Sequence, residues 1–366
     1  MANPKFIKSE RKLATIREVL EIRPIDGADM IEVAVIDGWE CVVKKDENFK
    51  VGDKVIYIEI DSILPEKPEF EFLRPRSFRI RTIKLRKQIS QGLVLPLSYL
   101  GENKKYKLDD DVTEELGIMK YDPELVIERE VRLPKPRNKF EKWLMKFEWY
   151  RNWKKRKILK SRVYFPGWIV KTDETRIQNL VKLFHEHQAK GTKFVVTEKI
   201  DGQSFTAYID DKDFVGICSR NLGLSKTEDS NYSKMYKKYD LENVLPRIKK
   251  SLGAKTVVLQ GEIAGPGVQG NKYKLEELEC FIFNVITNEK KIPLMDVETL
   301  LQENNLKQVP ILETGYTLPE TIKEVVDKSK GKSVLYNRKR EGLVIRSEDY
   351  QISFKVINPE FLLEEE

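Results

Sequence analysis

The sequence contains little histidine and little cysteine, and no long apolar run interrupts its 366 residues. Both histidines, His185 and His187, fall in one expected helix, which disfavours chemistry that needs a histidine base elsewhere in the chain. The three cysteines lie too far apart to indicate a disulfide framework or a metal motif. They are Cys41, Cys218 and Cys280. Because the chain has neither an apolar signal core nor a membrane-length segment, we expect a cytoplasmic protein with no membrane partner.

Positive charge is concentrated in one part of the chain. The whole sequence carries 66 Lys and Arg against 59 Asp and Glu, a formal net charge of +7. Between Lys135 and Arg162 there are twelve Lys or Arg and two Glu, so this segment carries +10 and the remainder about −3. A local basic segment indicates contact with a polyanion rather than a generally cationic surface. The length of the chain favours two domains.

Residues 1–130 are expected to form a β domain that binds nucleic acid. From residue 13 onward, short apolar runs alternate with connectors rich in Gly and Asp, as in a barrel or a sandwich. The expected strands are Ala14–Ile25, Met30–Ile36, Trp39–Val43, Lys54–Ile60, Phe78–Leu85 and Gly92–Leu95. We favour a five-stranded OB-type β-barrel, with a generic β sandwich as the alternative. Cations in Arg74–Lys87 recur two residues apart, and on a strand each pair would share a face that follows a phosphate backbone.

Residues 131–164 form a basic, aromatic connector that opens with Pro134 and Pro136. Aromatic and aliphatic residues from Phe140 to Tyr150 recur at roughly helical spacing, with Lys and Arg between them. We expect an amphipathic helix that packs one domain on the other, and a phosphate contact in the run 154–157. A solvated basic helix and a membrane-surface helix are the alternatives.

The stretch Val195–Tyr208 is the centre of the larger domain, residues 165–366. It consists of an apolar strand, a polar turn and a second apolar strand, and the turn contains Lys199, Asp201 and Gly202 in a K-x-D-G pattern. A lysine amine becomes a nucleophile when its surroundings hold it partly neutral. The alternative is a surface hairpin with an ordinary exposed lysine.

Further motifs follow this turn, each on or beside an expected strand. They are Ser219-Arg220-Asn221, Gly261-Glu262, Phe283 within Cys280–Val285, Glu341–Ile345, and Lys355 within Ser353–Val356. Charged or aromatic residues placed beside strands indicate a cleft between sheets. Upstream of the turn, Thr172 or Asp173 is expected to cap a helix that carries Ile177.

Together and in this order, the motifs resemble those of the covalent nucleotidyltransferases: ATP-dependent DNA and RNA ligases and mRNA capping enzymes. The resemblance covers roughly residues 193–361, and a weaker similarity extends over the β domain. DNA ligases and capping enzymes carry an OB domain after the last lysine motif, whereas here the β domain comes first and eleven residues follow Lys355. This order resembles the fifth clade of ATP-dependent RNA ligases. It implies an α+β fold, with an N-terminal OB-type β-barrel followed by a ligase-type nucleotidyltransferase domain of antiparallel sheets with flanking helices.

The resemblance implies a catalytic set of Lys199, Asp201, Glu341 and Lys355. Lys199 would attack the α-phosphate of ATP and hold AMP as a phosphoamide, and Lys355 would polarise that phosphate. Asp201 and Glu341 would hold Mg²⁺ or Mn²⁺, directly or through water. We expect Lys355 and the metal ion to lower the pKa of the Lys199 amine, because nearby positive charge favours the neutral form.

The resemblance also implies a set of residues that bind ATP. Glu262 and Arg220 would contact the ribose and the phosphates or the nucleic-acid end, and Phe283 would stack on adenine. The full set is Glu198, Lys199, Gly202, Arg220, Glu262, Phe283, Glu341 and Lys355. The last motif departs from the family, which often has Lys-x-Lys there, because Lys355 is the only match and Ser353 and Ile357 stand on either side of it. Gln203 and Ser204 stand where some RNA ligases have Asn.

We therefore expect a monomeric, ATP-dependent polynucleotide ligase, and specifically an RNA ligase that seals 3′-hydroxyl and 5′-phosphate ends through a lysyl-AMP intermediate and an adenylated 5′ end. Nicks with a ribonucleotide at the 3′-hydroxyl are the expected substrate. A DNA ligase and an RNA capping enzyme are alternatives that use the same chemistry. An inactive nucleic-acid-binding protein on a ligase-like core is an alternative of another class.

Overall fold

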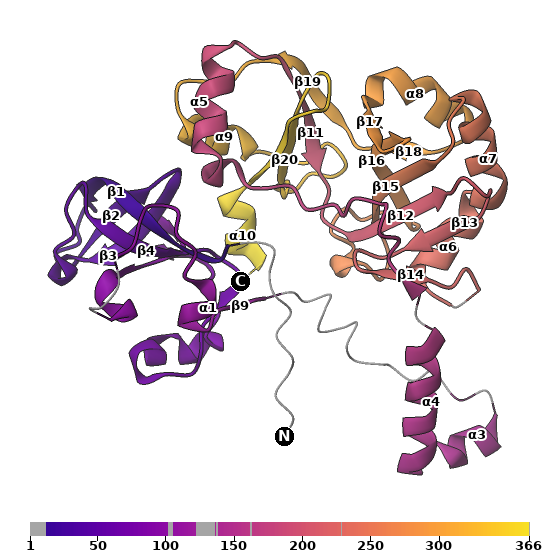
Figure 1. The fold of residues 1–366 in the computed structure, drawn as a ribbon, viewed down its shortest axis with the longest axis horizontal. Coiled ribbons are helices and arrows are strands. Elements are labelled where there is room, and N and C mark those ends of the chain that lie inside the picture. The colour runs from indigo at the N-terminus through magenta and orange to yellow at the C-terminus, as the bar shows by residue number, and fades with distance from the viewer. Residues whose placement is uncertain are drawn as a thin grey trace. The chain divides into compact units, whose positions relative to one another are not determined.

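The computed structural model describes residues 12–101, 105–121, 136, 138–161, 163–227 and 229–365, with backbone only at 155–161, 163–164 and 365. The chain divides into two compact units, whose strands and helices are labelled in Figure 1. The first contains Met1–Arg129, Ile177–Leu183 and Leu362–Glu366, and the second contains Glu130–Arg176 and Phe184–Phe361. None of the helices within the described ranges is long and apolar enough to cross a membrane.

The first unit is built on a curled antiparallel sheet (Figure 1). Its five strands run in the order β3-β2-β1-β4-β8. These strands are β1 (Ala14–Pro24), β2 (Ile31–Ile36), β3 (Trp39–Lys44), β4 (Lys54–Ile58) and β8 (Leu93–Pro96). The first half of β1 pairs with β4 and the second half with β2, with a register shift between Val19 and Glu21. A shift of this kind bends a strand. The expected OB-type domain is confirmed.

Short elements complete the first unit. They are η1 (Lys45–Glu47), β5 (Ser62–Ile63), η2 (Pro68–Arg76), β6 (Thr82–Leu85), β7 (Gln88–Gln91), η3 (Leu97–Leu100), α1 (Thr113–Leu116), β9 (Met119–Lys120) and η4 (Ile177–Asn179). Of these, β5 pairs with β9 and β6 with β7.

The cation pairs of Arg74–Lys87 do not lie on strand faces, and of the expected strand Phe78–Leu85 only β6 forms. Arg74 lies in η2 and pairs with Glu71, and Arg79 pairs with Asp61 at 2.6 Å. Ser77 and Phe78, between these two arginines, both adopt positive φ. Left-handed residues interrupt the alternation of a strand, so the arginine pairs do not share one strand face. Of the six cations paired in the sequence, only Lys84 lies within a strand, β6.

The segment Ile177–Leu183 belongs to the first unit, although it falls within residues 165–366, the predicted larger domain. The side-chain oxygen of Asn179 accepts a hydrogen bond from the indole of Trp39 at 2.7 Å, and its amide donates to Glu59 at 2.6 Å. Both partners are buried, and buried polar groups require such partners. The three-part division at residues 130 and 164 stays a prediction.

The described residues of the connector form two helices, α3 (Lys139–Leu144) and α4 (Glu148–Ser161), rather than the single expected helix. Asn138 caps α3 by accepting a hydrogen bond from the Glu141 amide at 2.7 Å. Pro134 lies outside the described residues, as do the side chains of Lys155, Arg156 and Lys157, on which the predicted phosphate contact depends.

The second unit contains two antiparallel sheets. The larger one runs β10-β14-β13-β12-β15-β16-β17, with β18 pairing in parallel with β16, and the smaller one runs β19-β11-β20-β21. The strands are β10 (Val163–Tyr164), β11 (Phe194–Lys199), β12 (Gln203–Ile209), β13 (Val215–Cys218), β14 (Leu222–Leu224), β15 (Val257–Ala264), β16 (Glu279–Thr287), β17 (Lys290–Ile292), β18 (Lys307–Gln308), β19 (Ile311–Tyr316), β20 (Gly342–Ser347) and β21 (Ser353–Ile357).

Helices flank these sheets (Figure 1). They are α6 (Asn231–Lys238), α7 (Leu241–Ser251), η5 (Gln269–Asn271), α8 (Leu294–Glu303) and α9 (Ile322–Ser329). Two more helices, α5 (Val181–Ala189) and α10 (Pro359–Glu365), each have residues in both units. Apolar residues of α7, such as Val244, Leu245 and Ile248, are buried against the larger sheet in one core cluster. Burial of one apolar face is what docks an amphipathic helix on a sheet. The predicted α+β fold with antiparallel sheets is confirmed.

The K-x-D-G stretch connects the two sheets. β11 lies in the smaller sheet and ends at Lys199, and β12 lies in the larger sheet and begins at Gln203. The two predicted strands are therefore correct, and the alternative of a surface hairpin is wrong, because β11 and β12 do not pair. A turn between two sheets places Lys199, Asp201 and Gly202 where both sheets contribute side chains.

Candidate active site

Lys199 is held against Glu341 by the pairing of two strands. Its amine donates hydrogen bonds to both carboxylate oxygens of Glu341, at 2.7 and 2.8 Å. In the β11–β20 ladder Lys199 lies opposite Gly342, the residue after Glu341. The side chain of Lys199 is 27% exposed and that of Glu341 14% exposed. The amine is therefore not directed into bulk water but toward a carboxylate from the neighbouring strand.

The charges around Lys199 shift its pKa in the direction opposite to the one expected from the sequence. Burial disfavours its ammonium form, but the carboxylates of Glu341, Glu262 and Asp201 outweigh burial and raise the pKa of the amine. We expected Lys355 and a metal ion to lower this pKa. Among the residues of the chain itself the acidic neighbours prevail, because they are more numerous and one of them forms a direct ion pair.

Asp201 and Gly202 are fixed by contacts that the sequence did not reveal. The amide of Asp201 donates to the Tyr273 hydroxyl at 2.7 Å, and its carboxylate forms an ion pair with Lys272. Gly202 is buried, and a Cβ on it would lie 2.2 Å from the Ile263 carbonyl oxygen. Only glycine permits this close approach of the turn to β15.

Lys355 and Arg220 converge on Asp173. The amine of Lys355 lies 3.0 Å from one oxygen of Asp173, and the guanidinium of Arg220 lies 3.4 Å from the other. Asp173 was predicted as a possible helix cap, but η4 begins only at Ile177 and this carboxylate pairs with two cations instead. Loop carboxylates carry no periodic signal, so sequence reasoning missed Asp173 as a member of the site.

Burial lowers the pKa of Lys355 to about 8, with Asp173 opposing the shift and with Arg176 and Lys199 adding to it. Lys355 and Lys199 are thus close enough to affect each other's charge. The ladder between β20 and β21 explains this proximity, because it places Lys355 opposite Val344 while β11 pairs with the other edge of β20.

Glu262 and Phe283 come from the larger sheet. Glu262 lies on β15 opposite Ser204, and its Cγ would be 3.0 Å from a Cβ on Gly202. Phe283 lies on β16 where the register with β15 shifts, so it is the extra residue of a bulge. Its ring is half-buried, whereas Ile282 and Asn284 beside it are buried. A bulge beside a site commonly redirects a side chain.

Glu198 precedes the lysine and is 1% exposed. One of its carboxylate oxygens accepts a hydrogen bond from the Val334 amide at 3.0 Å. The other, Oε1, is buried without a hydrogen-bond partner within the described part of the chain. Burial raises the pKa of Glu198. A buried acceptor of this kind fits a ligand that brings a hydrogen-bond donor.

The predicted metal ligands are close to Lys199 but do not form a closed cage. Across the described ranges, no group of three or more His, Cys, Asp or Glu is arranged to hold a metal ion. Asp201 and Glu341 are hard oxygen donors of the kind that Mg²⁺ and Mn²⁺ accept, and Mg²⁺ usually takes one or two carboxylates and completes its shell with water and phosphate. The two carboxylates therefore fit an ion of that type.

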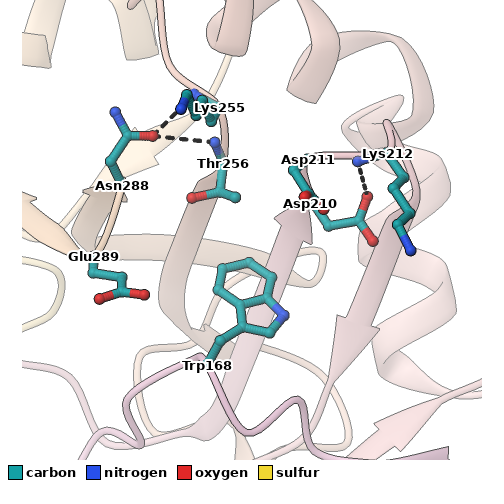
Figure 2. A pocket seen from close by; sticks show the side chains of 8 residues that line it. All are labelled: Trp168, Asp210, Asp211, Lys212, Lys255, Thr256, Asn288 and Glu289. Atoms are coloured by element: carbon teal, nitrogen blue, oxygen red, sulfur yellow. Dashed lines mark hydrogen bonds between the residues drawn. The ribbon is translucent and has the colours of Figure 1, made fainter.

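A separate hollow lies at the opposite end of the larger sheet (Figure 2). Its lining comes from Trp168 and from loops that follow β12, precede β15 and follow β16. Asn288 there accepts a hydrogen bond from the Lys255 amide at 2.9 Å, and Asp210 accepts one from the Lys212 amide at 2.9 Å. These polar groups stabilise turns, and none of the predicted site residues lines this hollow.

A lysine at the junction of two antiparallel sheets, with acidic neighbours and a second lysine nearby, is the arrangement expected of a covalent nucleotidyltransferase. Comparison with known proteins specifies the family. An OB-fold domain model matches residues 13–97, and the RNA ligase family model matches residues 192–357. No curated protein sequence matches the chain.

Solved structures of an RNA ligase from Naegleria gruberi are similar to the whole chain. An aspartate-to-alanine variant without ligand is 33% identical, with a TM-score of 0.79, and the match covers 97% of this chain and 98% of that one. The enzyme with pyrophosphate is 34% identical with the same coverage and TM-score. A lysine-to-alanine variant with ATP and manganese is 33% identical, with a TM-score of 0.78 and coverage of 96% and 99%. The chain belongs to the RNA ligase family.

Proposed function

We propose that this chain is an ATP-dependent RNA ligase that joins a 3′-hydroxyl to a 5′-phosphate through an adenylate held on Lys199. The observation that carries the proposal is the Lys199 amine, fixed 2.7 Å from Glu341 at the junction of the two sheets and close enough to Lys355 for their charges to interact. The similar Naegleria enzyme was solved with ATP and with AMP, in each case with manganese. A nucleotide bound at this junction would lie near both lysines.

Variants of the similar enzyme support the choice of residues. They replace a lysine, an aspartate two positions after it, and a glutamate 142 positions after it. Lys199, Asp201 and Glu341 stand at the same separations in this chain. A further variant replaces a lysine fourteen positions after that glutamate, which is the separation between Glu341 and Lys355.

Three transfers account for sealing. The neutral amine of Lys199 attacks the α-phosphorus of ATP, so a P–N bond forms, the P–O bond to pyrophosphate breaks, and the amine loses a proton. An oxygen of the RNA 5′-phosphate then displaces the Lys199 amine, which regains its proton, and AMP is joined to the 5′ end. Finally the 3′-hydroxyl attacks the 5′-phosphorus, loses its proton, and releases AMP.

The residues of the chain supply position and charge for these transfers. Phosphoryl transfer depends on in-line geometry and on cations at the phosphate oxygens. Lys355 and Arg220 would provide the cations, and Asp173 holds both side chains in place. A divalent ion held by Asp201 and Glu341 would supply further positive charge at the phosphates and draw the Glu341 charge away from the Lys199 amine.

Two residues are suited to the base of ATP. Adenine carries one exocyclic amine, a donor that matches the unpaired buried Oε1 of Glu198. The half-buried ring of Phe283, placed by the bulge in β16, offers an apolar face for stacking. Glu262 would accept hydrogen bonds from the ribose hydroxyls.

A labelling experiment tests the function. The protein is incubated with ATP or GTP labelled at the α-phosphate and with Mg²⁺ or Mn²⁺, and the covalent adduct is resolved on a denaturing gel. An adenylating ligase is labelled by ATP, a capping enzyme by GTP, and an inactive core by neither. Sealing of nicked duplexes with a ribose or a deoxyribose at the 3′-hydroxyl then distinguishes an RNA ligase from a DNA ligase.

Asp173 links two cations, and its removal should change the pH dependence of adenylation. Burial lowers the pKa of Lys355 and the Asp173 carboxylate raises it, and the net pKa is about 8. In Asp173→Asn this pKa should fall further, so the ammonium form is lost at lower pH. The neutral form of Lys199 becomes more abundant as the pH rises, so kcat/KM for ATP should increase with pH until the Lys355 charge is lost. We expect this increase to stop near pH 8 in the wild type and at a lower pH in the variant.

Two further variants test whether Lys355 is the group responsible for this pH dependence. Lys355→Arg should let the increase continue above pH 8, because a guanidinium stays charged. Asp213→Asn, which removes an exposed partner of Lys249, should leave the profile unchanged. Identical alkaline limbs in the wild type and in Asp173→Asn would contradict the role given to Lys355.

The substrate is nucleic acid, as its family and its OB-type unit indicate. We infer that the OB-type unit and the basic connector hold the substrate mainly through phosphates. Contacts of that kind weaken steeply with salt, since each displaces condensed counterions. Raising the salt from 50 to 200 mM should therefore lower kcat/KM for RNA sealing by about 10-fold or more, while adduct formation changes little. Equal salt dependence of the two reactions would argue against this mode of binding.

We also propose that the enzyme acts as a monomer in the cytoplasm. All three cysteines are free and buried, as expected of a protein in a reducing compartment. Light scattering at several protein concentrations tests the monomer, and fractionation of the source cells tests the location.

A further inference from the structure

The connector presents an aromatic surface that the reaction as proposed does not use. We call α3, α4 and the turn between them, Lys139–Ser161, the aromatic hairpin. Five of its rings are exposed: Phe140 by 66%, Trp143 by 51%, Phe147 by 40%, Trp149 by 63% and Trp153 by 52%. Isolated exposed aromatics are ordinary, but exposed rings that contact one another, as these do within two groups, mark a binding surface.

The rings form two ordered groups, Phe140–Trp143–Phe147 and Trp149–Tyr150–Trp153. In the first group, Phe140 and Trp143 are stacked with centroids 6.0 Å apart, and Phe147 meets Trp143 edge-on at 4.9 Å. In the second group, Tyr150 stacks on Trp153 at 5.7 Å and meets Trp149 edge-on at the same distance. Each group therefore presents a composite aromatic face rather than a single ring.

Polar contacts hold the hairpin in shape. Lys154 on α4 forms an ion pair with Glu141 on α3, and both side chains are largely buried. The guanidinium of Arg151 donates to the carbonyls of Met145 and Lys146, at 3.0 and 2.9 Å, and so satisfies carbonyls after the end of α3. A surface that is ordered before binding loses less entropy when a ligand arrives.

Cations are interleaved with these rings. Lys139 shares a helix face with Trp143, four residues later, and Lys154 lies over the Tyr150 ring, 5.7 Å from its centroid. An amphipathic helix that lies on a membrane keeps its cations and its apolar side chains on opposite faces. Mixed rings and cations in a segment of net charge +10 are instead typical of surfaces that bind single-stranded nucleic acid, where bases stack on rings and phosphates meet lysines.

We propose that the aromatic hairpin binds unpaired bases of the RNA substrate by stacking, with its lysines at the phosphates. The proposal deepens the function given above, because it assigns the enzyme a preference for RNA that has a single-stranded segment. Stacked bases inside a perfect duplex do not offer their faces, whereas unpaired bases do.

The test compares alanine and tyrosine variants of Trp143 and Trp153. The probe is a fluorescently labelled 12-nucleotide single-stranded RNA, and anisotropy gives its Kd. Loss of one stacked base costs roughly 1–3 kcal/mol, so Trp143→Ala/Trp153→Ala should raise Kd by about 10-fold or more. Trp143→Tyr/Trp153→Tyr keeps a ring at each position and should stay within about 3-fold of the wild type. Phe214→Ala, which removes a ring that is 56% exposed elsewhere in the second unit, should have no effect.

Two further readouts separate the possible failures. Adduct formation from labelled ATP should be unchanged in the double alanine variant, which shows that the catalytic core is folded. A wild type that forms no adduct would refute the proposed function, whereas equal Kd values in adduct-forming variants would refute only the role of the hairpin. Binding to phosphatidylserine vesicles that the alanine variant loses, with RNA binding retained, would identify a membrane-binding hairpin and overturn the proposal.

Discussion

Replacing Lys199 with alanine should abolish the labelled AMP–protein adduct. Among the described residues, Lys199 is the amine that donates to Glu341, and Lys355 lies across β20 in an ion pair with Asp173, so we expect no other amine to substitute. Lys199→Arg should fail equally, although it retains the charge opposite Glu341, because a guanidinium is a poor nucleophile at neutral pH. Adduct is measured on a denaturing gel, and the exposed Lys190→Ala serves as the matched control.

A second substrate shows whether Lys199→Ala is merely misfolded. RNA that already carries AMP on its 5′-phosphate needs only the third transfer, in which the lysine amine forms no bond. Lys199→Ala should therefore still join pre-adenylated RNA, at a rate within about 10-fold of the wild type. Adduct that persists in Lys199→Ala would disprove the assignment of the nucleophile. Loss of both reactions would instead point to a structural role for Lys199.

Local patterns in the sequence predicted most of the strands around the site. The expected strands that carry or adjoin the motifs after the K-x-D-G turn are present as β13, β15, β16, β20 and β21. Most of these strands are buried on both faces, and a short continuous apolar run next to polar residues can be recognised without the fold. The aromatic hairpin shows the limit of this approach, because helical spacing suggested one helix where the Met145–Phe147 turn separates two.

Contacts between residues that are far apart in the sequence could not be predicted from local patterns. Lys199 and Glu341 are 142 positions apart and meet only because β20 pairs with β11. Asp173 belongs to the site through ion pairs from a loop, and Phe283 is redirected by a register shift. The direction of the Lys199 pKa shift depends on three carboxylates from three segments, so it could not be derived from the motifs one by one.

Gly202→Ala should damage the site as severely as the loss of a catalytic group. The added Cβ would lie 2.2 Å from the Ile263 carbonyl oxygen and 3.0 Å from the Cγ of Glu262, so the turn has to move away from β15. That movement displaces the other two fixed residues of the K-x-D-G motif, Lys199 and Asp201, relative to the larger sheet. A shift of about 1 Å in a reacting group can cost about 100-fold in rate, and overpacking of a buried position typically costs about 1–3 kcal/mol of stability.

Gly167→Ala is the matched control, because nothing lies within 4 Å of a Cβ at that position and its φ is not in the left-handed region. We expect Gly202→Ala to lower both the melting temperature and the rate of adduct formation, and Gly167→Ala to change neither. Since the obstacle at Gly202 is a backbone oxygen rather than the end of a flexible side chain, the neighbouring strand cannot give way cheaply. A Gly202→Ala protein that forms adduct at the wild-type rate would show that the K-x-D-G turn does not depend on close contact with β15.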